Sequence, residues 1–114
     1  MKITWPPGDL EEICASSKLL HRQFATNDAA VKQILTVLRY SSSLKEVREF
    51  KSLSLLFVSP TKKTDGELLI RFKEIDVTAT LLDNSGKPVR STLRSPTELD
   101  EIRQLRLNAI RFSA

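Results

Sequence analysis

Apolar residues in the N-terminal part of the chain recur every three or four positions, which is the spacing of one face of an α-helix. At the start of the first such stretch, Asp9 can cap a helix, and Glu12 completes a pair of the capping-box type. The pattern predicts a helix over residues 10–25. Its buried stripe is formed by Leu10, Ile13, Ser17, Leu20 and Phe24.

Two further helix starts follow in the sequence. Small polar residues and an acid at positions 26–28 precede apolar residues at helical spacing up to Tyr40. This second helix is expected to form a hairpin with the first. Ser43 with Glu46 gives another capping box and predicts a short third helix. The apolar side of that helix carries Leu44, Val47 and Phe50.

After Phe50 the apolar period changes from about 3.6 residues to two, which is the alternation of a half-buried strand. Strands are predicted at residues 53–58, 68–73, 75–81 and 88–93. The turn at residues 83–86 contains Asn and Gly, which tolerate positive φ, so the fourth strand can pair back on the third. The sequence therefore predicts a four-stranded antiparallel sheet with an open edge.

The C-terminal segment carries signals of a helix start. Ser95 fits the N-cap, Pro96 the first helical position and Glu98 the third. An apolar stripe continues from there through Leu99, Ile102, Leu105, Ala109 and Phe112. These features predict a C-terminal helix. Leu107, Ala109 and Arg111 also alternate, so a strand over the last six residues is the alternative.

Together these elements predict an α+β fold in a single domain over residues 1–114. The order is an N-terminal helical hairpin, a short third helix, a four-stranded antiparallel sheet and a C-terminal helix, with the helices on one face of the sheet. Residues 1–8 precede the first cap and contain Pro6 and Pro7, so we expect a non-helical N-terminal arm. With 114 residues and 40% hydrophobic content, the chain is long enough to bury one core without disulfides or metals.

The residues available for chemistry are few. Cys14 and His21 are the only thiol and the only imidazole, and on one helix they stand about 10 Å apart along the axis. One Cys and one His cannot build a structural zinc site, and three glycines in all leave no glycine-rich phosphate loop. We therefore expect no catalytic residues, no metal, no cofactor and no small-molecule substrate, so the protein is not expected to be an enzyme.

The lone cysteine also bears on where the protein works. It cannot form an internal disulfide, which favours a reducing compartment. The longest apolar run, which begins at Leu53, is far shorter than the ~20 residues that cross a bilayer. An intracellular protein, cytoplasmic or nuclear and without membrane insertion, is expected.

Basic residues form the one local excess of charge. The chain has a net charge of +4, and from residue 87 onward six cations stand against three acids. On the predicted helix Arg103 and Arg106 share a face, and Arg90 and Arg94 would lie near them, with Lys62 and Lys63 extending the patch. Such a patch suits phosphates or an acidic protein surface. The alternative is a solvated face, because arginines late in a helix also complement its dipole.

Trp5 is the second candidate for binding, because the only tryptophan stands in the non-helical arm. It either packs on its own domain or anchors in another chain. The sequence carries no motif of a known family. We expect a non-catalytic protein-interaction module or small subunit of a larger assembly, in a hetero-complex or homodimer, which binds through Trp5, the open sheet edge and apolar residues such as Leu56 and Val58. The alternative is a basic nucleic-acid-binding domain that contacts the phosphate backbone.

Overall fold

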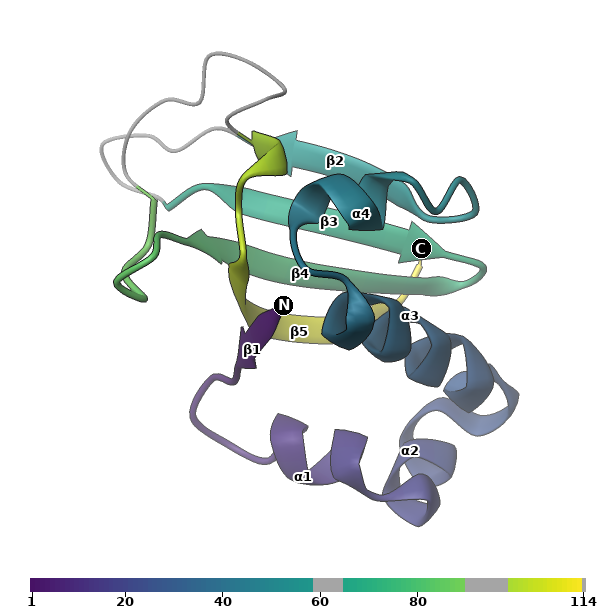
Figure 1. Ribbon diagram of the computed structural model, residues 1–114. Coiled ribbons are helices and arrows are strands. Elements are labelled where there is room, and N and C mark those ends of the chain that lie inside the picture. Colours follow the sequence, from purple (N-terminus) through teal and green to yellow (C-terminus); the bar gives the residue numbers. More distant parts are fainter. Residues whose placement is uncertain (59–64, 90–98, 114) are drawn as a thin grey trace.

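The computed structural model describes residues 1–58, 65–89 and 99–113. Its centre is a five-stranded sheet in the order β1-β5-β4-β3-β2 (Figure 1). The strands are β1 (Lys2–Thr4), β2 (Ser54–Val58), β3 (Glu67–Phe72), β4 (Ile75–Leu82) and β5 (Gln104–Phe112). All neighbours are antiparallel except β1, which runs parallel to β5, so the sheet is mixed. N-terminal helices pack on one face, which confirms the α+β class.

The helices are α1 (Leu10–Ala15), α2 (Ser17–Phe24), α3 (Asp28–Tyr40) and α4 (Leu44–Arg48). The single helix predicted over residues 10–25 is divided at Ser16, which is extended and whose hydroxyl accepts a hydrogen bond from the Leu19 N–H at 3.2 Å. A 3₁₀ turn at Ala25–Asn27 leads directly into α3. Helices α1, α3 and α4 begin at the predicted cap positions, but the side chains of Asp9, Asn27 and Ser43 make no cap hydrogen bond, so the two predicted capping boxes do not form. No helix of the described chain has the length and apolar character needed to span a bilayer.

The core lies between the helices and one face of the sheet. Helix α3 contributes Val31, Ile34 and Leu38, none of which is exposed to solvent. Every second residue of β3 and β4 meets them, and these residues are fully or almost fully buried: Leu68, Ile70, Phe72, Ile75, Val77, Ala79 and Leu81. The alternation that predicted these strands therefore marks the layer that packs on the helices.

The predicted C-terminal helix is wrong, because residues 104–112 form strand β5. Leu105, Leu107 and Ile110 are its core residues. The register with β4 shifts between Thr78 and Ala79, which makes Asn108 the extra residue of a β-bulge. The bulge lengthens one inward step, from Leu107 to Ile110, to three residues, so the strict alternation that marks a strand is interrupted. The predicted start at Ser95 lies outside the described residues.

Only residues 88–89 of the predicted fourth strand are described, and they do not form the ladder along β4; residues 90–93 lie outside the described residues. Strand β5 forms that ladder, and the described part of the segment contributes only an isolated bridge between Leu82 and Pro88. The turn before it forms as expected, with the Asp83 carboxylate accepting hydrogen bonds from the N–H groups of Ser85 and Lys87. The prediction of a four-stranded antiparallel sheet fails because it placed residues 104–112 in a helix and overlooked β1.

We predict that Leu107→Ala lowers the free energy of unfolding by roughly 2–5 kcal/mol, the range for truncating a buried leucine. Leu107 is fully buried in β5, whereas it stands outside the apolar stripe of the helix that the sequence suggested. Urea unfolding measures the loss. Arg111→Ala, an exposed change in the same strand, is the control and should stay within about 0.5 kcal/mol of the wild type.

Candidate functional site

The face of the sheet turned away from the helices carries the polar residues of the alternating strands. Cross-strand pairing aligns one charged row across it, from Ser54 through Arg71 and Asp76 to Arg111. A second row runs from Leu56 through Leu69 and Thr78 to Ala109. We call this surface the open face. It consists of Ser54, Leu56, Val58, Glu67, Leu69, Arg71, Asp76, Thr78, Thr80, Arg106, Asn108, Ala109 and Arg111.

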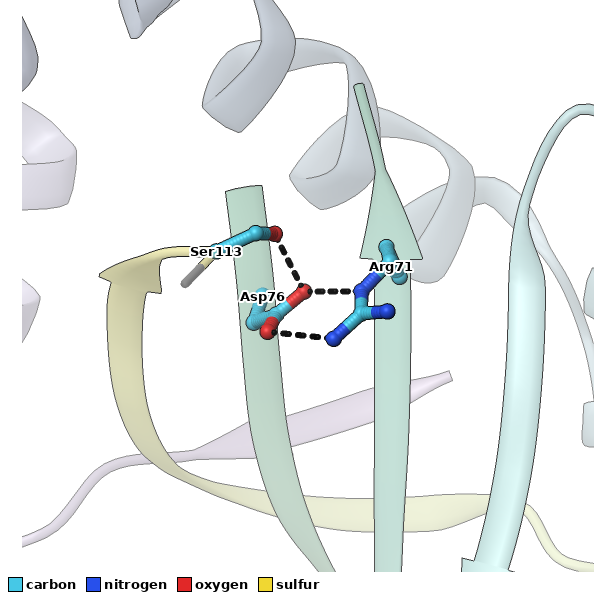
Figure 2. Close-up of polar contacts among 3 residues, drawn as sticks. All are labelled: Arg71, Asp76 and Ser113. Atoms are coloured by element: carbon cyan, nitrogen blue, oxygen red, sulfur yellow. Dashed lines mark hydrogen bonds and ion pairs between the residues drawn. The ribbon is translucent and has the colours of Figure 1, made fainter. Parts of the chain in front are cut away.

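An ion pair occupies the charged row (Figure 2). Arg71 donates from Nε to Asp76 Oδ1 at 2.8 Å and from Nη2 to Oδ2 at 3.1 Å, and the Ser113 hydroxyl donates to Oδ1 at 2.7 Å. The hydrogen bond from Arg71, followed by the one from Ser113, holds the pKa of Asp76 below its usual range. The Arg71 charge is therefore balanced within the fold.

Thr80 is the centre of a second polar cluster on the open face. Its hydroxyl oxygen accepts hydrogen bonds from Asn108 Nδ2 at 2.8 Å and from Arg106 Nη2 at 3.3 Å. Arg106 Nε also donates to Asn108 Oδ1 at 3.4 Å. Only donors surround the hydroxyl, and no carboxylate or imidazole of the described residues is bonded to it. The cluster fixes the bulged part of β5 against β4 and does not activate a nucleophile.

The two residues suited to nucleophilic chemistry have separate surroundings. Cys14 is buried in α1, and burial raises the pKa of its thiol to about 11, partly offset by the charge of Arg39. His21 lies on α2, exposed, with Nδ1 at 3.2 Å from Asp28 Oδ2. A protonated thiol is a poor nucleophile. Among the residues with described positions, no group of three or more His, Cys, Asp or Glu side chains is arranged to hold a metal.

The residues predicted to form a basic patch are not brought together where the structure describes them. Arg106 lies on the open face, whereas Arg103 stands before β5 and lines a small hollow with Lys45 and Asp100. Arg103 and Arg106 were expected to be adjacent because they share a face of the predicted C-terminal helix. That helix does not form at these positions, so the expectation is wrong. The remaining patch residues, Lys62, Lys63, Arg90 and Arg94, lie outside the described residues.

Trp5 follows β1 directly. It is half-buried and packs against the hydrophobic core cluster of its own chain. Trp5 therefore packs on its own domain, the first of its two expected alternatives, and its anchoring in another chain stays a prediction.

The edge strand β2 presents apolar side chains to solvent. It pairs only with β3 among the described strands. Leu56 is 59% exposed and Val58 is 53% exposed, and both lie on the open face. Leu69 of β3 stands opposite Leu56 and is half-buried, so it extends the apolar row inward.

The ion pair between Arg71 and Asp76 was not predicted from the sequence. A signal for it is present, because the short Lys73–Glu74 turn makes Phe72 pair with Ile75 and Arg71 with Asp76. Opposite charges placed directly across a hairpin attract one another. Lys73 has φ 54°, the left-handed conformation that such a tight turn requires.

No protein-family model matches the chain, and no significant match to a curated protein or to a solved structure is found.

We predict that Asp76→Asn lowers the free energy of unfolding at neutral pH, with a difference from the wild type that shrinks in acid. The folded-state pKa of Asp76 is depressed, so its contribution is present above the unfolded-chain value of about 3.9 and is lost as the pH falls through the folded value. Urea unfolding at pH 7 and below pH 3 tests this. A difference that stays constant with pH would contradict the ion pair.

We also predict that Cys14 reacts with dithionitrobenzoate at least about a hundredfold more slowly in the folded protein than in guanidinium. The thiol is buried and its pKa of about 11 leaves little thiolate at neutral pH. The absorbance of the released thiolate follows the reaction. Equal rates in the two conditions would mean that the thiol is accessible and reactive.

Proposed function

We propose that the protein is a non-catalytic protein-interaction module, or a small subunit of a larger assembly, that binds another protein chain through β2. The observation that carries this proposal is the exposure of Leu56 and Val58 on an edge strand of the sheet. A partner strand that pairs with β2 would extend the sheet and cover both side chains at once.

The composition of β2 supports this role. Sheet edges in soluble proteins are commonly protected by lysine, proline, a bulge or a very short strand. Strand β2 is Ser-Leu-Leu-Phe-Val, without charge or proline, and pairs in regular register with β3 from end to end. An unprotected edge of this kind is a template for a further strand.

The open face beside β2 offers the partner a mixed surface. Leu69 continues the apolar row, and Glu67 and Arg71 flank it on β3. Docking would therefore combine main-chain pairing with burial of about two to three aliphatic side chains, each worth roughly 1.5–3 kcal/mol when fully buried. The ordering costs of association reduce the net gain.

Nucleic-acid binding is the competing reading. Phosphate binding needs free cations, but Arg71 is paired with Asp76, and Arg106 donates hydrogen bonds to Thr80 and Asn108. Arg111 is the one arginine of the described open face with neither a hydrogen bond nor an ion pair, and the exposed apolar side chains of β2 lie on the same face, so the balance favours a protein partner.

We predict that Leu56→Lys with Val58→Lys abolishes partner capture when the tagged full chain is purified from its native cells. Lysine on an edge strand opposes pairing and removes the apolar contact. The matched control is Gln33→Lys with Thr36→Lys, which adds the same two charges to exposed positions of α3. Quantitative mass spectrometry compares the three samples, and circular dichroism checks that each variant is folded.

Nuclease treatment before capture distinguishes protein binding from nucleic-acid binding. A protein complex survives the treatment, whereas association through nucleic acid is lost with it. If the β2 variant and the α3 control lost partners equally, the added positive charge, and not the change to the strand edge, would explain the loss. Undiminished capture by the β2 variant would refute the proposed site.

A further inference from the structure

The opposite edge of the sheet is only partly covered. The residues of β1 pair with residues 104–106 of β5, and the chain then reaches Pro6 and Pro7. Proline has no backbone N–H, so the ladder cannot continue through these positions. Residues 107–112 of β5 therefore have no strand partner on this side within the described chain.

A cleft of about 330 Å³ opens along that uncovered edge. Asn108, which is bonded to Thr80 on the open face, and Ile110, which is buried on the helix side, both line it. A cavity that touches residues from both faces of a strand lies at the edge of that strand. Residues 6–9 and the side of α1 and α2 that carries Ile13 and Phe24 form the facing wall. We call this cavity the β5 cleft.

The walls of the β5 cleft differ in character along its length. Ile13, Phe24 and Ile110 make it apolar, and the Phe24 ring also contacts Phe112, with ring centroids 5.7 Å apart. Phe112 is 51% exposed, so the apolar surface continues beyond the cleft. The arm contributes Pro6, Pro7 and Leu10 to the lining, together with Gly8 and Asp9.

A single charge completes the β5 cleft. Asp9 is the only charged residue among its described lining residues, in a chain whose net charge is +4. Its carboxylate is exposed, makes no cap hydrogen bond to α1 and forms no ion pair within the described ranges. A ligand that carries both a positive charge and apolar groups complements the cleft.

We propose that the β5 cleft binds an extended peptide segment of a partner protein, with a basic side chain against Asp9 and apolar side chains against Ile13, Phe24 and Phe112. The segment continues the sheet where β1 stops, as an added strand beside β5. A second copy of this chain that donated β2 would lack the basic group, because residues 54–58 carry no charge. The site is independent of the function proposed for β2, which concerns the other edge.

The test is a titration of the isotope-labelled full chain with the acetylated hexapeptide Lys-Thr-Val-Thr-Leu-Thr, followed by amide chemical shifts. Shifts are expected at residues 107–112 and around Ile13 and Phe24, about two thirds complete at about 2 mM peptide and close to saturation at about 10 mM for a Kd of about 1 mM. Replacing Lys by Glu in the peptide should weaken binding by about tenfold. A peptide with Pro in place of Val and Leu cannot pair as a strand and should not bind.

Two variants at exposed positions make the test specific. Gln23→Arg places a cation and extra bulk in the cleft and should abolish binding of the lysine peptide, whereas Gln33→Arg on α3 is the matched control and should leave it unchanged. Asp9→Lys should reverse the preference, so that the glutamate peptide binds better than the lysine peptide. Because none of these side chains is buried, loss of folding is not expected, and the amide spectrum checks it.

Several outcomes would overturn the proposal. These are the absence of shifts at residues 107–112, shifts confined to β2, equal binding of the lysine and glutamate peptides, and equal effects of Gln23→Arg and Gln33→Arg. Shifts at β2 alone would leave the function proposed for that edge intact while removing this site. Concentration-dependent shifts without peptide, together with dimer formation in sedimentation, would identify a second copy as the occupant and refute the peptide.

Discussion

The sheet depends on the insertion of β5 between β1 and β4. Leu105 and Leu107 of β5 are fully buried, and its ladder with β4 extends from Ile75 to Leu82. Without β5, strand β1 would have no partner, β4 would become an edge, and the helices would lose part of the apolar surface on which they pack. The same strand also separates the two surfaces considered for binding, since the polar residues of its bulge fix the open face and its outer edge borders the cleft.

The elements that were predicted correctly are those with local signals. Residues Asp9, Asn27 and Ser43 mark the helix starts, and the alternation of β2, β3 and β4 gives both their positions and their inward faces. The elements that failed depend on partners distant in sequence. Strand β1 is three residues long and is defined by pairing with residues 104–106. The bulge at Asn108 arises from the register with β4 and interrupts the alternation by which β5 could have been recognised as a strand.

The candidate binding surfaces also differ in how far the sequence could predict them. Leu56 and Val58 were identified from the sequence. They belong to a strand with apolar residues at successive positions, and only one of its two faces can pack on the core, so apolar side chains remain on the other face. The adjacency of Arg103 and Arg106 was inferred from a helix that does not form, so this prediction was wrong. The β5 cleft was not predicted, because it exists only where the proline pair ends β1 beside a strand nearly a hundred residues away.

The regular, uncharged β2 has a further consequence for the protein when no partner is bound. Segments that combine β-branched or aromatic residues with low charge and no proline can stack as identical strands of many copies. The net charge of +4 opposes that stacking by mutual repulsion between copies. Salt screens the repulsion over distances of about 8 Å at physiological ionic strength but leaves the apolar attraction in place. Higher ionic strength is therefore expected to favour self-assembly over dispersed chains, and a partner bound at β2, as proposed above, would remove that edge from the process.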